Sequence, residues 1–217
     1  MDLRRYFTII FIFLLCLGGI GMLLTILQYT SFDRTAGFLY YKQFIVNNNF
    51  WRLIFYVHVF TCFVCLAAGL TQFSGDILRN YPKVHRTLGR VYFYNIIFIN
   101  FPAGFILALN ANGHLPGKFA FITLDLLWLY FTVSAVVSVR QGDVDRHRRQ
   151  MIRSYALTLT ALTLRFVKMS MVKYSNWNYD EIYVFDAWSA LLINLTVAEI
   201  IIYFSFYRSK RKLITSK

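Results

Sequence analysis

Two short stretches of this sequence place a histidine beside arginines, ahead of an apolar run. One reads His-Arg-Thr-Leu-Gly-Arg-Val-Tyr from His85 to Tyr92, and the other begins His-Arg-Arg-Gln-Met-Ile-Arg at His147. Neutral imidazole nitrogens bind transition metals and haem iron, and arginines can neutralise haem propionates. His85 and His147 are therefore a candidate metal site, or the axial ligands of a b-type haem.

The same residues also have a plainer interpretation. Histidine and arginine at the mouth of a membrane helix commonly hydrogen-bond to loop carbonyls and lipid phosphates. Both interpretations stay open from the sequence, and each expects the two histidines at matching depth near one membrane surface.

A second set of chemical groups lies inside the apolar runs themselves. Ionisable side chains at membrane depth are costly and mark functional sites by default. At about 1.5 Å per helical residue, His58 and Asp125 are each expected about 10 Å below the same surface, with Arg165 in the same half of the bilayer. An ion pair between Arg165 and Asp125, beside His58, would either hold helices together or form a site for an anionic or quinone-like ligand or a proton relay. Glu199 belongs to the opposite half, within reach of lysines and arginines of the basic loops, and the sequence does not identify its partner.

The run that contains His58 also shows helical periodicity. Small and polar residues recur on it every three or four positions, which predicts one inward-facing stripe; these are His58, Cys62, Cys65, Gly69 and Gln72. Gln72 joins Asp125 and Arg165 as a candidate ligand-binding or proton-relay residue, His58 is a third candidate haem ligand, and the two cysteines are expected to pack.

These residues must be positioned by membrane helices. The chain is 58% hydrophobic and only 15% charged, and about 20 apolar helical residues cross a bilayer. Six runs fit this length, which predicts an all-α, polytopic membrane helix bundle forming one transmembrane domain over residues 1–217. The predicted spans are 6–28, 51–73, 91–109, 119–139, 151–171 and 185–207.

The basic residues predict an orientation. Of 23 lysines and arginines, sixteen flank one side of the predicted spans and five the other. The positive-inside rule places the richer side, with both chain termini, in the cytoplasm of a cell membrane, which is the inner membrane if the source is bacterial. Anionic lipid head groups account for the net charge of +13, so no nucleic-acid partner is needed.

The two His-Arg motifs resemble those of a known family. The His-Arg-x-x-Gly-Arg-x-Tyr stretch, the His-Arg-x-x-Met-x-Arg-Ser-Tyr-Ala-Leu-Thr stretch from His147, His58 and Gln72 together resemble an uncharacterised bacterial multi-pass membrane family. The resemblance covers roughly residues 51–165 and implies membrane topology. A more distant, topological similarity is to b-type membrane cytochromes, whose histidines on neighbouring helices bind haem.

Three functions follow as hypotheses. We favour a redox or electron-transfer protein that binds haem b through His85 and His147 or His58. The alternatives are a small transporter or ligand-binding protein that uses His58, Asp125 and Arg165, with a quinone or another small molecule as ligand, and a non-catalytic membrane scaffold. No phosphate-binding glycine loop, zinc-protease signature or nucleophile elbow is present, so hydrolytic and nucleotide-driven functions are not expected.

Overall fold

The computed structural model describes residues 17–207, and every regular element in that range is helical. A helix over residues 17–27 and two short 3-10 turns, η1 (Gln28–Ser31) and η2 (Gly37–Lys42), precede the main bundle. The bundle elements follow in chain order: α2 (Asn49–Gln72), α3 (Gly75–Asn80), α4 (Pro82–Asn95), the π-turn η3 (Ile96–Asn100), α5 (Phe101–Leu109), α6 (His114–Arg140), α7 (Val144–Tyr174), α8 (Tyr179–Ile202) and the π-turn η4 (Tyr203–Tyr207).

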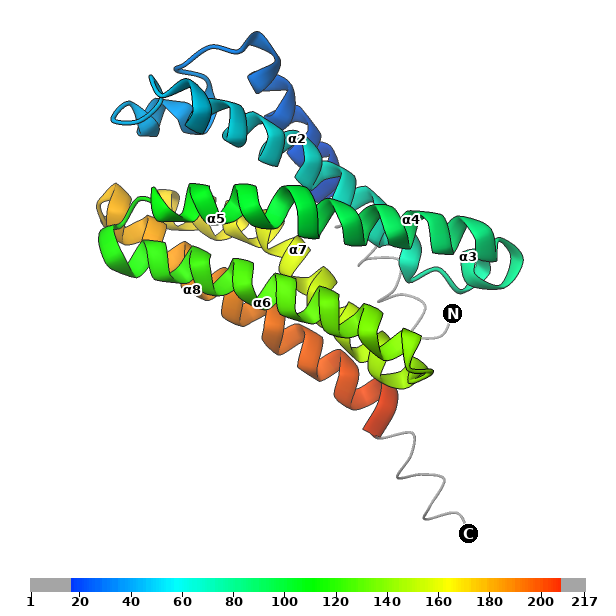
Figure 1. Ribbon diagram of the computed structural model, residues 1–217. Coiled ribbons are helices and arrows are strands. Elements are labelled where there is room, and N and C mark those ends of the chain that lie inside the picture. Colours follow the sequence, from blue (N-terminus) through cyan, green and yellow to red (C-terminus); the bar gives the residue numbers. More distant parts are fainter. Residues whose placement is uncertain (1–16, 208–217) are drawn as a thin grey trace.

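The long helices run roughly along one direction, and α4, η3 and α5 form one nearly continuous rod (Figure 1). We call the end where α2 and α8 begin the Lys42 end, and the opposite end, where α4 and α7 begin, the His85 end. Helix α2 packs on α4 and diverges from α5 towards the Lys42 end, so that it and the first helix stand apart from the other helices there (Figure 1).

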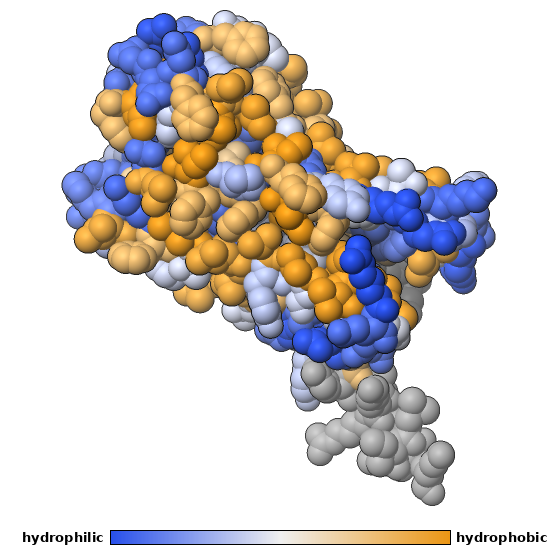
Figure 2. Space-filling model, in the orientation of Figure 1, coloured by the Kyte–Doolittle hydropathy of each residue, from blue (hydrophilic) through white to orange (hydrophobic). Residues whose placement is uncertain are grey.

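Four helices of the described residues are long and apolar enough to cross a membrane: Asn49–Gln72, Pro82–Leu109, His114–Arg140 and Tyr179–Phe206. Figure 2 shows apolar residues between two polar ends, as expected for a surface that faces lipid. Four of the six predicted spans thus correspond to apolar helices of spanning length. The predicted span 151–171 is helical within α7, which is more polar, and the predicted span 6–28 lies partly outside the described residues.

The helices begin earlier than the apolar runs do. Pro82 occupies the first turn of α4, and the Asp143 side chain accepts a hydrogen bond from the Arg146 backbone N–H to cap α7. A proline in the first turn and a side-chain acceptor at the N-cap both favour helix initiation. The helices therefore extend beyond the predicted spans that start at 91 and 151, and His85 and His147 lie in the first turns of their helices.

A π-turn within the α4–α5 rod fastens it to α2. Asn100 is fully buried, and its amide donates to the Asn95 side chain at 2.8 Å, while the Asn95 amide donates to the Thr61 carbonyl at 2.9 Å. The Cys62 thiol donates to the Asn100 side-chain oxygen. Pro102 lacks the N–H of a regular helical residue, which favours the irregular turn just before it.

Candidate functional site

A cavity of about 450 Å³ opens between the diverging helices at the Lys42 end. Its wall takes residues from the first helix, η2, α2, α5, α6, α7 and α8. Most of the wall is apolar, with aromatic side chains such as Phe55, Phe121 and Trp128, and a few polar groups converge on it. A largely apolar cavity of this size with few polar groups is typical of small-molecule sites.

The three ionisable residues that the sequence places at one depth all line this cavity: His58 from α2, Asp125 from α6 and Arg165 from α7. Gly104 on α5 makes room for two of them. A Cβ atom there would lie 2.9 Å from Asp125 Oδ1 and 3.4 Å from His58 Cε1, so both side chains lie over the bare backbone of this glycine.

The predicted ion pair between Arg165 and Asp125 is wrong. No nitrogen of Arg165 lies within 4.0 Å of an Asp125 oxygen among the ion pairs of the described residues, and Arg165 Nη1 instead donates to the carbonyl of Ala161 at 2.7 Å. Asp125 is 4% exposed, and its Oδ2 is buried without a hydrogen-bond partner. An acidic and a basic side chain therefore face one cavity without bonding to each other.

Sequence reasoning missed three further charged residues in the cavity wall, Lys42, Lys168 and Asp186. The ammonium of Lys168 donates to the Tyr179 hydroxyl at 3.1 Å and lies 4.4 Å from the centroid of that ring. Asp186 is 3% exposed, and its Oδ1 is buried without a partner. Asp186 stands at the beginning of the predicted span 185–207, whereas α8 begins six residues before that span, at Tyr179.

Lys42 lines the cavity from η2. It is 1% exposed, and its Nζ donates to the Asn110 carbonyl at 2.5 Å and to Asn112 Oδ1 at 2.6 Å. Burial lowers the pKa of Lys42 to about 8, an effect that Asp180 partly offsets and Lys118 reinforces. These bonds join η2 to the α5–α6 connection, so the segment over the cavity is fixed by contacts with residues far along the chain.

The other predicted histidines lie at the opposite end of the bundle. His147 Nδ1 lies 2.9 Å from the Ala135 carbonyl and donates to it, which leaves Nε2 available, while His85 Nδ1 is buried without a partner. Neither lines the cavity that contains His58, and within residues 17–207 no group of three or more His, Cys, Asp or Glu side chains is arranged to hold a metal.

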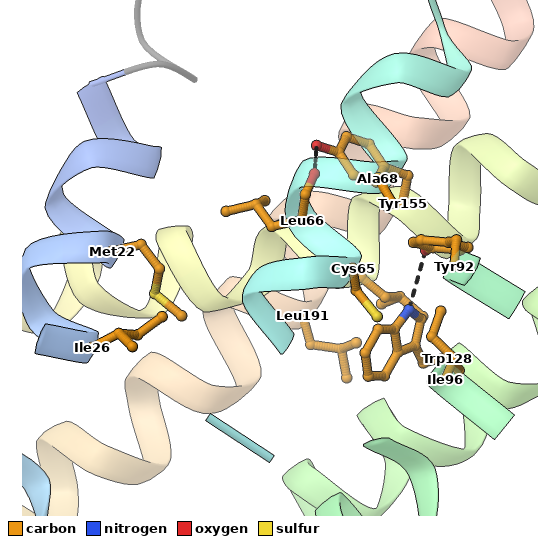
Figure 3. Close-up of a cluster of buried hydrophobic side chains, with 11 residues drawn as sticks. Met22, Ile26, Cys65, Leu66, Ala68, Tyr92, Ile96, Trp128, Tyr155 and Leu191 are labelled. Carbon is orange, nitrogen blue, oxygen red and sulfur yellow. Dashed lines mark hydrogen bonds between the residues drawn. The ribbon is translucent and has the colours of Figure 1, made fainter. Parts of the chain in front are cut away.

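The two His-Arg motifs meet through their later residues. The Tyr92 hydroxyl lies 2.8 Å from both Ser154 Oγ and Thr158 Oγ1, and Trp128 Nε1 donates to Thr158 at 3.1 Å. Figure 3 shows Tyr92 and Trp128 joined in this core, with the Tyr155 hydroxyl bonded to the Leu66 carbonyl. The motifs thus hold α2, α4, α6 and α7 together beneath the cavity, whose floor includes Trp128 and Thr158.

Two remaining candidates lie away from the cavity. Gln72 packs against Gly89 of the first motif, and its amide donates to Thr71 Oγ1 at 3.1 Å. Glu199 accepts from Nε and Nη2 of Arg153, at 2.5 and 2.9 Å, so the partner that the sequence left open is a basic residue of α7 near the His85 end.

A comparison with protein families gives one match: residues 55–202 fit a family described as "Predicted membrane protein (DUF2306)". The matched range includes both His-Arg motifs and the cavity residues His58, Asp125 and Arg165. No match was found among curated proteins or among solved structures.

Proposed function

The chain belongs to the DUF2306 family of predicted membrane proteins, and from that premise we propose that it is a ligand-binding membrane protein whose small-molecule ligand occupies the cavity at the Lys42 end. One observation carries the proposal. Asp125 is buried beside His58 with an unpartnered oxygen, and Arg165 lines the same cavity without an acidic partner.

Buried polar side chains such as these lower the stability of the folded protein if no partner contacts them. An unsatisfied buried polar group costs about 1–3 kcal/mol, and a charged group costs more. In a protein that only packs its helices, these side chains would be expected to pair with each other. Their arrangement around a space of about 450 Å³ instead suits a bound molecule that supplies the missing partners.

The proposal is tested by ligand-dependent stabilisation of the detergent-purified protein, screened by thermal unfolding against a library of small molecules that includes quinone analogues. A hit should stabilise the wild type but not Ala161→Phe, which fills the cavity, nor Arg165→Ala. Val172→Phe adds similar bulk to α7 at a position 63% exposed on the surface and should keep the effect. A hit that stabilises Ala161→Phe as well as it stabilises the wild type would place binding elsewhere.

A b-type haem or metal site at His85 and His147 is the second candidate, because the hydrogen bond from His147 Nδ1 to Ala135 is the kind that orients an iron-ligating imidazole. When bound, such a group would supply one-electron chemistry. His85 and His147 would be its ligands, and the arginines next to them would face its propionates.

An oxidised and dithionite-reduced absorption spectrum with a pyridine haemochrome assay tests this candidate. His85→Ala and His147→Ala should abolish a reduced α-band, whereas His114→Ala, an exposed histidine at the Lys42 end, should retain it. Folded protein that stays colourless after haem-supplemented expression contradicts it. A scaffold role is left if the spectrum and the ligand screen are both negative.

A further inference from the structure

The charges around the cavity identify the class of ligand, given that the proposed ligand cavity is correct. We infer that the occupant is a small zwitterion, a molecule that carries an ammonium group together with a carboxylate or a phosphate. The evidence lies in the charged residues that the structure describes in the cavity wall, two acids and three bases, none of which pairs with another. One of the bases, Lys42, already donates to Asn110 and Asn112, which leaves Arg165 and Lys168 facing the two acids.

The two acidic side chains lack hydrogen-bond donors. Asp125 and Asp186 are 4% and 3% exposed, both line the cavity, and each has one buried carboxyl oxygen without a partner. Ionised carboxylates only accept hydrogen bonds, and an ammonium group offers three donors and the opposite charge. A ligand ammonium therefore suits the acidic side of the cavity.

The basic side chains of α7 are suited to bind an anion. Arg165 Nη1 donates to the Ala161 carbonyl of its own helix. Its guanidinium has five N–H donors, so further donors are left for a ligand. Lys168 follows three residues later, so it lies on the same face of α7 and lines the same cavity. An arginine with free donors next to a lysine suits a carboxylate or a phosphate.

A molecule with one kind of charge would leave the other side uncompensated. A simple anion would match Arg165 but leave Asp125 without a donor, and a simple amine would do the reverse. A neutral quinone would compensate neither charge. Removing a charge from water without a partner is costly, so a zwitterion is the ligand class that satisfies both sides, while the aromatic wall contacts its apolar part.

Two sources supply this chemistry. One is a soluble metabolite of the amino-acid type, and the other is the head group of a zwitterionic phospholipid such as phosphatidylethanolamine. Both carry the two charges that Asp125 and Arg165 would meet, and the experiment separates them.

The test compares three probes of nearly the same shape: phenylalanine, phenethylamine, which lacks the carboxylate, and 3-phenylpropionate, which lacks the ammonium. Binding is measured by isothermal calorimetry on the full chain in detergent. Phenylalanine should bind at least tenfold more tightly than either analogue. Phosphatidylethanolamine and phosphatidylglycerol are compared in parallel by native mass spectrometry, and retention of the former alone identifies the lipid source.

Two isosteric or near-isosteric variants assign the charges. Asp125→Asn should remove the preference for phenylalanine over 3-phenylpropionate, and Arg165→Gln should remove its preference over phenethylamine. Asp145→Asn and Lys173→Gln change exposed residues of α7 outside the cavity wall and should leave both preferences unchanged. A thermal unfolding profile like that of the wild type shows that each variant is folded.

Equal binding of all three probes, or failure of both phenylalanine and phosphatidylethanolamine to bind, overturns the zwitterion inference. If a library molecule of another class then stabilises the wild type but not Ala161→Phe, the ligand cavity stands and only the class is wrong. If no molecule does so, the proposed function fails as well.

Discussion

Lys42 joins distant parts of the chain beside the cavity. Its ammonium is buried and reaches two acceptors, the Asn110 carbonyl and Asn112 Oδ1, which are 68 and 70 positions away in the chain. Bonds of this kind fix a loop more firmly than its own 3-10 turn does, because short 3-10 segments have poor hydrogen-bond geometry. The cavity therefore depends on a charged side chain outside the membrane-spanning helices.

The buried position of Lys42 makes stability depend on pH. Its pKa is about 8 in the folded protein and 10.5 when exposed, so between these values the unfolded state binds the proton and the folded state does not. Stability from this residue therefore rises as pH increases from about 8 towards 10.5, by up to about 3 kcal/mol. Thermal unfolding in detergent at pH 7 to 10.5 should show the wild type gaining relative to Lys42→Met.

Lys83→Met is the control for the removal of one lysine charge, since Lys83 is exposed at the His85 end. Its difference from the wild type is subtracted at each pH. If the wild type and Lys42→Met then keep a constant separation across the range, Lys42 is not buried as a titrating group.

For single residues, the sequence predicted how deep each side chain lies in the membrane. Counting along helices placed His58, Asp125 and Arg165 in one layer, and all three line the cavity. The direction in which each side chain points around its helix depends on how the helices pack, which one sequence does not specify. For that reason the Arg165 to Asp125 ion pair was wrong, and the roles of Lys42 and Asp186 were not foreseen.

Close contact between α2 and α7 depends on Gly69. A Cβ atom at this position would overlap the ring of Tyr155, which is itself buried and bonded to the Leu66 carbonyl. Overpacking of this kind costs about 1–3 kcal/mol, so Gly69→Ala should lower the midpoint of thermal unfolding. Gly21→Ala in the first helix meets no atom within 4 Å and should leave the midpoint unchanged; equal effects would mean that α2 and α7 are not in this contact.

The hydroxyl cluster around Tyr92 should stabilise the packing of α4 on α7. Tyr92→Phe leaves Ser154 and Thr158 without their shared partner, and interhelical hydrogen bonds in membranes are worth about 0.6–2 kcal/mol each. We expect a loss of about 1–2 kcal/mol in unfolding free energy, measured in mixed micelles. Tyr94→Phe, a change at a position 50% exposed, is the matched control with an expected loss near zero.

A double-mutant cycle makes this prediction sharper. If Tyr92 and Ser154 interact directly, Tyr92→Phe combined with Ser154→Ala should cost less than the sum of the single changes. Additive losses would contradict the hydrogen bond.

At the scale of elements, apolar runs predicted most helices but not where the helices begin. Helix α4 extends back to Pro82 and α7 back to Val144 because capping and first-turn residues continue the helix beyond the apolar run. Helix α7 is long but polar, since it buries Ser154, Thr158 and Thr160. A hydropathy average does not distinguish such an inward polar face from a loop.

The two ends of the whole molecule differ in charge, and this difference gives the prediction for its orientation. Exposed basic residues such as Arg79, Lys83 and Arg86 cluster at the His85 end, which the positive-inside rule places in the cytoplasm, close to anionic lipid head groups. The Lys42 end, with the cavity, is then expected on the side away from the cytoplasm.

Single cysteines at the two ends test this orientation in intact cells. In a background with Cys16, Cys62 and Cys65 replaced by alanine, Arg34→Cys introduces an exposed thiol near the Lys42 end and Lys83→Cys an exposed thiol at the other. A membrane-impermeant maleimide should label Arg34→Cys in intact cells but Lys83→Cys only after permeabilisation, because a charged reagent does not cross the bilayer. Asp145→Cys, in the first turn of α7, must behave as Lys83→Cys does. The reverse pattern would place the Lys42 end in the cytoplasm, and labelling of both ends in intact cells would mean that the helices between them do not cross the membrane.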